Sequence, residues 1–272
     1  MTFSQLAENI RRQNSFLCVG LDVDPQKIPV HLSHEKEPML AFNKTIVDAT
    51  APYCVAYKPN TAFYEAQGVK GWLVLEKTVD YIRAQYPDKF LIADAKRGDI
   101  GNTSKMYAET FFRHMDFDAV TLSPYMGYDT VAPFFEYPGK WAIVLGLTSN
   151  ASAAEMQMQP TGNKRMYQHV LESVAAWGSK ENTMFVIGAT RAKELEEVRK
   201  IVPEHFLLVP GVGAQGGSLT DVANYGLTPQ GGLLVNSSRG IIYASADEGF
   251  AEAAAMQARQ VQQQMKNLLP VR

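Results

Sequence analysis

The stretch FLIADAKRGDIGNTS, residues 90–104, begins as an apolar run and ends in charged and polar residues. Its first half is typical of a strand buried on both faces, the kind found in parallel sheets. Asp94, Lys96 and Asp99 then follow within six positions. Side chains alternate along a strand, so Asp94 and Lys96 are expected on the same side, with Asp99 beyond Gly98 in the next loop. The stretch therefore predicts a parallel strand whose carboxyl end carries chemistry.

The same pattern of a short apolar run ending in Gly, Pro, Asp or Ser recurs along the chain. Eight such runs begin at Phe16, Tyr53, Phe90, Ala119, Trp141, Met184, Phe206 and Gly232. Segments of helical period separate them, and an Ala- and Gln-rich tail from Ala244 to Leu268 predicts a closing helix. Eight strand–helix units, without a GxGxxG turn after the first strand, favour a (β/α)8 TIM barrel over a doubly wound sheet. We expect one domain spanning residues 1–272.

The composition indicates a small-molecule enzyme or binding protein. Of 272 residues 46% are hydrophobic, and the formal net charge of −2 gives no sign of a nucleic-acid surface or a basic membrane anchor. The amino-terminal segment, residues 1–16, mixes charged and apolar positions like an amphipathic helix and has no apolar core of a signal peptide. Cys18 and Cys54 fall in predicted strands and have no CxxC spacing, which predicts buried free thiols and a cytoplasmic protein.

Catalytic residues of such barrels come from the carboxyl ends of the strands. Those ends carry Asp22 on the first strand, Lys58 on the second, Asp94 and Lys96 on the third, and Ser149 after the fifth. A single charged pair there would be interpreted as a solvated salt bridge. Alternating charges on adjacent strands, with Asp99 close by, favour a site because buried charges are tolerated only when they pair with one another.

The last two strands end in features suited to an anion. The loop VPGVGAQGG, residues 209–217, surrounds Gln215 with glycines, so its backbone N–H groups are exposed. The sequence NSSRG, residues 236–240, adds Arg239, whose guanidinium group matches phosphate oxygens. Phosphate sites of this fold form from the loops after strands seven and eight. Position and chemistry together predict a phosphate site; tight turns and a surface arginine are the alternative.

DAKRGDI, preceded by the Lys58 strand and followed by PGVGAQGG and SSRG, resembles the orotidine 5′-phosphate decarboxylase family over nearly the whole chain. The sequences KPNTAFYE and VIGATR are similar to its longer-chain, type 2 branch, and Gly101 stands where the shorter branch usually has proline. The resemblance implies a homodimer that converts orotidine 5′-monophosphate to UMP and CO2 without a metal or organic cofactor. It implies a catalytic tetrad of Lys58, Asp94, Lys96 and Asp99, with Lys96 as proton donor and Asp99 supplied by the partner subunit.

The resemblance also implies contacts with the substrate. Asp22 would hold the ribose hydroxyls, Gln215 and Arg239 the phosphate, and Ser149 the amide edge of the pyrimidine, with Thr148 and Asn150 as neighbouring alternatives. Ile100, Thr103 and Pro210 complete the expected substrate-binding residues.

Two other functions stay open at this point. One is a metal-dependent sugar-phosphate decarboxylase or aldolase on the same barrel, which would need an acid where this chain has Lys58. The other is a nucleotide-binding barrel without catalysis, which would have no need for a lysine flanked by two acids. Activity in the presence of a chelator distinguishes all three.

Overall fold

Eight parallel strands close into a barrel in the computed structural model, which describes residues 1–191, 193–212 and 216–270. Each strand pairs with its successor along the chain, apart from a short hairpin between the fifth and sixth, and the last pairs with the first. The barrel strands are β1 (Leu17–Leu21), β2 (Ala56–Pro59), β3 (Phe90–Arg97), β4 (Ala119–Leu122), β5 (Trp141–Leu147), β8 (Thr183–Ile187), β9 (Phe206–Pro210) and β10 (Leu233–Ser237). The predicted (β/α)8 architecture is confirmed.

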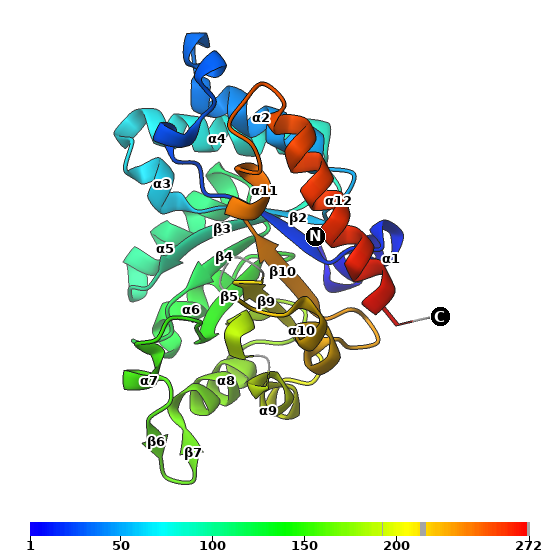
Figure 1. Cartoon of the computed structure of the whole chain (residues 1–272). Helices are drawn as coiled ribbons and strands as arrows, with labels where there is room; N and C mark the ends of the chain where they lie inside the picture. The colour runs from blue at the N-terminus through cyan, green and yellow to red at the C-terminus, as the bar shows by residue number, and fades with distance from the viewer. Residues whose placement is uncertain (192, 213–215, 271–272) are drawn as a thin grey trace.

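Helices form an outer layer around this barrel (Figure 1). They are α1 (Phe3–Gln13), α2 (Pro38–Thr50), α3 (Thr61–Glu65), α4 (Gly68–Gln85), α5 (Gly101–Glu109), α6 (Tyr128–Phe135), α7 (Ala153–Met156), α8 (Met166–Trp177), α9 (Glu194–Ile201), α10 (Leu219–Gly226), α11 (Arg239–Ile242) and α12 (Phe250–Leu268). Short 3-10 helices lie at Pro25–Lys27, Val30–His34 and Ala189–Arg191. A π-helix at Thr110–His114 continues α5. A hairpin of β6 (Pro160–Thr161) and β7 (Lys164–Arg165) projects from the body after β5.

The amino ends of the strands are closed by aromatic packing. Phe3 of α1 stacks near Trp141 of β5 and meets Phe206 of β9 edge-on, with ring centroids 6.4 and 5.1 Å apart. The Trp141 indole N–H also donates to the backbone oxygen of Met1, at 2.8 Å. This explains the amphipathic pattern of the amino-terminal segment, because α1 lays its apolar face over this end of the barrel. Access to the barrel is left at the carboxyl ends.

Strand register brings the polar residues at the carboxyl ends into one layer. Gly20 of β1 lies opposite Lys58 of β2, and Asn60 pairs with Asp94 of β3. Gly20 is required here, because a Cβ at this position would lie 1.8 Å from the Ser238 hydroxyl oxygen. The close approach of β1 to the end of β10 therefore depends on the missing side chain.

Two boundaries differ from the sequence prediction. The closing helix α12 begins at Phe250 and not at Ala244, because Asp247 accepts hydrogen bonds from Ser245 and from the Gly249 N–H and forms a turn there. Cys54 lies just before β2 and not within it. Both thiols are free and buried, and burial raises the pKa of Cys54 to about 11 and that of Cys18 further still.

Candidate active site

Asp94 lies between two lysines at the carboxyl ends of β2 and β3. Its Oδ2 accepts a hydrogen bond from the Lys58 ammonium group at 2.6 Å, and its Oδ1 accepts one from Lys96 at 2.5 Å. Lys58 and Asp94 are 5% and 10% exposed, whereas the Lys96 side chain is 50% exposed. Lys96 is therefore the member of the trio that a bound molecule can reach.

The pKa shifts of this trio keep its buried members charged. Burial alone would raise the pKa of Asp94, but the ammonium groups of Lys58 and Lys96 outweigh burial and hold that pKa well below its usual range. Burial alone would lower the pKa of Lys58, but Asp94 and then Asp22 outweigh it and raise that pKa. The buried carboxylate of Asp94 and the buried ammonium group of Lys58 are therefore both charged at neutral pH.

Thr121 of β4 joins two members of the trio and was missed by the sequence analysis. Its buried hydroxyl donates to Asp94 Oδ1 at 3.1 Å and accepts the backbone N–H of Lys96 at 2.9 Å. The Lys96 backbone has φ of 45°, in the left-handed region that lysine rarely adopts. The single hydroxyl of Thr121 thus fixes both a carboxylate and a strained backbone. In the sequence it resembles any β-branched strand residue.

Asp99 is not brought into this cluster within one chain. It is half-buried, its Oδ1 accepts the N–H of Ile100 at 2.8 Å, and it makes no ion pair with the described residues. Ile100 and Thr103, at the start of α5, are exposed. In the sequence, Lys96 lies between two acids, Asp94 and Asp99. In the structure of one chain, Asp94 lies between two lysines, Lys58 and Lys96.

A cavity of about 290 Å³ brings Asp22 and Arg239 together. Asp22 follows β1 and Arg239 begins α11, after β10, so the first and last strands each supply one of them. Tyr243 and Phe63 line the same cavity, and the Tyr243 hydroxyl donates to the backbone oxygen of Asp22 at 3.2 Å. Asp22 Oδ1 is buried and has no hydrogen-bond partner among the described residues. A carboxylate oxygen in this state is suited to a hydroxyl donor on a ligand.

The end of β5 is held by a network around Thr148. The Gln157 side chain accepts the Thr148 N–H at 2.7 Å and donates to its hydroxyl at 2.8 Å, while that hydroxyl donates to Asn150 at 2.6 Å. Ser149 lies between these two residues and packs closely against Gly188, where a Cβ would come within 2.7 Å of Ser149. The side chains of Thr148 and Asn150 are therefore hydrogen-bonded to each other.

The remaining predicted contacts belong to β9 and its loop. Pro210 ends β9 and is half-buried. Gln215, predicted to contact phosphate, lies outside the described residues. In the described part of the chain no three His, Cys, Asp or Glu side chains are grouped as a metal site would need, and no helix there could span a bilayer.

Comparison with known proteins places this chain in a family. A model of the "Orotidine 5'-phosphate decarboxylase / HUMPS family" matches residues 15–254. The chain belongs to this family. The orotidine 5'-phosphate decarboxylase of Phocaeicola vulgatus is 57% identical over 270 residues, covering 99% of each chain. A putative orotidine-monophosphate-decarboxylase structure from Toxoplasma gondii has 33% identity and a TM-score of 0.84, with 97% of each chain covered. One from Streptomyces avermitilis has 30% identity and a TM-score of 0.83, covering 97% of this chain and 94% of that one.

Membership of the orotidine 5′-phosphate decarboxylase family confirms the resemblance stated from DAKRGDI and its flanking sequences. Within the described residues the fold brings together Lys58, Asp94 and Lys96 in one group and Asp22 and Arg239 in another. Their roles, like those of Asp99, Ile100, Thr103, Ser149, Pro210 and Gln215, stay predictions.

Proposed function

We propose that this chain decarboxylates orotidine 5′-monophosphate to UMP, the last step of UMP biosynthesis. The observation that carries the proposal is the buried Lys58–Asp94 pair holding the half-exposed Lys96, in a chain of this family. A non-catalytic nucleotide-binding barrel would gain nothing from burying such a costly group of charges.

The chemistry needs a cation at the pyrimidine C6 carbon. When the bond from C6 to the carboxylate breaks, CO2 leaves and the electron pair remains on C6, where no neighbouring group delocalises it. The Lys96 ammonium group stabilises that charge and then transfers a proton to C6, which completes UMP. The neutral lysine regains a proton from water. Lys58 and Asp94 hold Lys96 in place throughout, since their short hydrogen bonds fix its position before the substrate arrives.

The substrate is bound by residues from several other strand ends. The unpartnered Asp22 carboxylate oxygen accepts from the ribose hydroxyls, and Arg239, in the same cavity, binds the phosphate together with Gln215. Ser149, which lies between the hydrogen-bonded Thr148 and Asn150, contacts the amide edge of the pyrimidine. Pro210, Ile100 and Thr103 border the substrate. Binding energy from the remote phosphate helps to organise the reacting end.

The reaction needs neither a metal nor an organic cofactor, because Lys96 supplies both the positive charge and the proton. A metal-dependent sugar-phosphate reaction would use Asp94 as a ligand of a divalent cation. In this chain the Lys58 ammonium group lies 2.6 Å from that carboxylate and would repel such an ion. The free buried thiols also fit a reducing, cytoplasmic location.

The active unit is a homodimer with Asp99 contributed across the interface. Exposed apolar side chains occur on the neighbouring helices α5 and α6 and just before each of them: Ile100, Met106, Tyr125, Met126 and Tyr128. Tyr125 is 83% exposed, which is unusual for a large aromatic residue outside an interface. Asp99 lies at the edge of this surface without an ion partner among the described residues of its own chain.

Loss of the orotidine 5′-monophosphate absorbance, followed with purified protein in excess EDTA, tests the proposal. We expect wild type to form UMP and Lys96→Ala to lose more than about a hundredfold in turnover. Lys200→Ala, an exposed lysine on α9, serves as the matched control and keeps full activity. UMP binding without turnover in wild type would leave a nucleotide-binding barrel, and activity only with added Mg²⁺ would indicate the metal-dependent reaction.

A further inference from the structure

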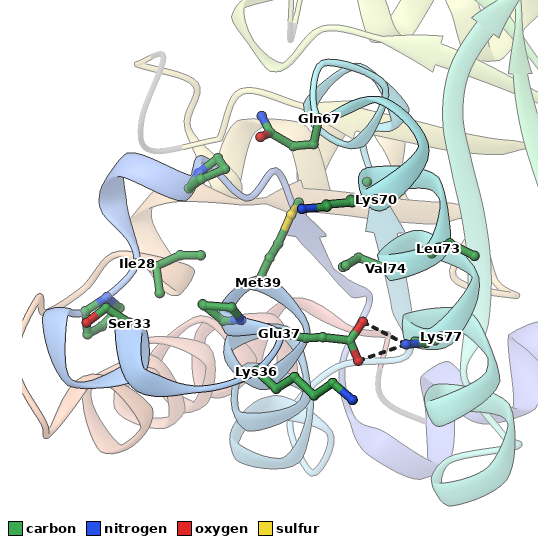
Figure 2. A pocket seen from close by; sticks show the side chains of 14 residues that line it. Ile28, Ser33, Lys36, Glu37, Met39, Gln67, Lys70, Leu73, Val74 and Lys77 are labelled. Carbon is green, nitrogen blue, oxygen red and sulfur yellow. Dashed lines mark hydrogen bonds and ion pairs between the residues drawn. The ribbon is translucent and has the colours of Figure 1, made fainter.

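A second cavity, of about 650 Å³, lies on the outer layer away from the Lys58–Asp94–Lys96 trio. Figure 2 shows it between the segment before α2 and the first turns of α4. Its volume lies in the range of small-molecule sites. None of the residues assigned to the decarboxylase site lines it, so it calls for a separate explanation.

One wall of this cavity is apolar. Ile28 and Met39 lie across it from Val74 of α4, and Pro38 and Leu73 also line it. Leu73 is 47% exposed, although its neighbour Val74 is buried. An exposed leucine next to a cavity offers apolar area that a ligand can cover.

The charged residues around the cavity are unbalanced. Lys36, Lys70 and Lys77 line it with one acid, Glu37. Glu37 is committed to Lys77, whose ammonium group donates to both carboxylate oxygens at 2.7 and 2.8 Å. Lys36 and Lys70 make no ion pair with the described residues. Lys70 and Met39 both line the cavity, so a positive charge and apolar surface share its lining. Two ammonium groups of the lining, those of Lys36 and Lys70, thus have no carboxylate as an ion-pair partner among the described residues.

We propose that this cavity binds a small organic anion with an apolar body. The body would cover Met39 and Val74, and the acidic group would meet the ammonium group of Lys70, with Lys36 adding positive charge to the lining. A purely apolar ligand would leave both lysines unused, and a bare inorganic anion would leave the apolar wall uncovered. The combination of a carboxylate, sulfonate or phosphate with an apolar ring or chain uses both.

The cavity shares a chain segment with the substrate site. Pro25 and Ile28 line this cavity. Asp24, just before Pro25, and Lys27, just before Ile28, line the smaller cavity that holds Asp22 and Arg239. An aromatic anion could therefore enter either cavity. A test must separate the two, and UMP does so because it occupies the substrate site in the proposed function.

Fluorescence titration with 8-anilinonaphthalene-1-sulfonate, an aromatic monoanion, provides the test on the full chain. We expect one saturable site that remains when UMP is saturating. Exposed ion pairs contribute modestly, so the variant Lys36→Met/Lys70→Met should weaken binding about three- to tenfold at low salt, and salt should weaken wild-type binding. Lys193→Met/Lys200→Met makes the same charge change on and beside α9 and should leave binding unchanged.

A second probe separates charge from apolar contact. N-phenyl-1-naphthylamine has the same rings without the sulfonate, and we expect it to bind more weakly than the sulfonate and equally to wild type and Lys36→Met/Lys70→Met. The proposal is overturned if UMP displaces the sulfonate probe, if that variant binds it as wild type does, or if the neutral probe binds as tightly. The lysine-variant and neutral-probe readouts use neither turnover nor UMP, so failure of the proposed decarboxylase function would leave both of them valid.

Discussion

Asp94 accepts hydrogen bonds from Lys58, Lys96 and Thr121, and this explains how a carboxylate can be buried at the mouth of the barrel. Each oxygen has a charged donor, and Oδ1 has a neutral one in addition. Removing either lysine would leave the acid with less compensation, whereas removing Thr121 leaves all charges present. Thr121 is therefore the position at which alignment can be tested separately from charge.

We predict that Thr121→Val lowers kcat about tenfold and changes KM little, because the Lys96 N–H and Asp94 each lose one hydrogen bond. Thr121→Ser keeps the hydroxyl and should recover most of the activity. Steady-state kinetics on orotidine 5′-monophosphate, with a thermal unfolding curve for each variant, provide the measurement. A loss of thermal stability without a loss of kcat would remove the positioning role. An equal loss of kcat in Thr121→Val and Thr121→Ser would also remove it.

The residues of the site differ in how visible they are from sequence. Asp94 and Lys96 lie at the carboxyl end of an apolar strand, so their position at the mouth could be predicted from where that strand ends. Thr121 could not, since its role depends on a contact between β4 and β3 that no local pattern encodes. The environment of Asp99 could not be predicted either, because it depends on where the loop after Gly98 leads.

At the scale of elements, the eight barrel strands could be predicted because each is an apolar run between polar turns. The hairpin β6–β7 was not predicted. Each of its strands is two residues long, and neither contains an apolar run. The hairpin turns at Gly162, which has φ of 65°. Short elements of this kind are set by the turn and by contacts such as Lys164 with Glu172 of α8 at 2.6 Å.

The junction of α9 with β9 contains a histidine that should make stability depend on pH. Burial, followed by the nearby Arg199, lowers the pKa of His205 to about 4, and neither ring nitrogen has a hydrogen-bond partner among the described residues. Between pH 6.5 and 4 the unfolded chain binds a proton that the native ring resists. The free energy of unfolding therefore falls as pH decreases through this window, and the full contribution is present above pH 6.5.

We predict that His205→Leu flattens this dependence, by about 1 to 2 kcal/mol across the window once the water that still reaches the ring is allowed for. Urea unfolding of wild type and variant at several pH values between 4 and 7 measures it. His114→Leu, at an exposed histidine, is the control and should keep the wild-type slope. Parallel curves for His205→Leu and wild type would show that the ring titrates normally in the native state.

At the scale of the whole molecule, aromatic side chains close one end of the barrel and the charged trio occupies the other. Phe3, Trp141 and Phe206 fill the amino end, while at the carboxyl end Lys96 shares its acid with Lys58. The apolar surface on α5 and α6 lies beside Asp99. A second chain placed on that surface would cover the exposed side chains and could bring its own Asp99 toward Lys96, which joins the dimer to the chemistry.

Mixing two inactive variants tests this arrangement. If Asp99 acts across the interface, Lys96→Ala and Asp99→Ala homodimers are both impaired, but a hybrid dimer has one site with Lys96 from one chain and Asp99 from the other. Random reassortment of equal amounts should then restore about a quarter of wild-type activity, since half of the dimers are hybrids with one intact site of two. If Asp99 acts within its own chain, every site in the mixture lacks one residue and no activity returns. Size-exclusion chromatography of the mixture, after reversible dissociation, shows that dimers have reformed, so an inactive mixture of intact dimers would contradict the shared site.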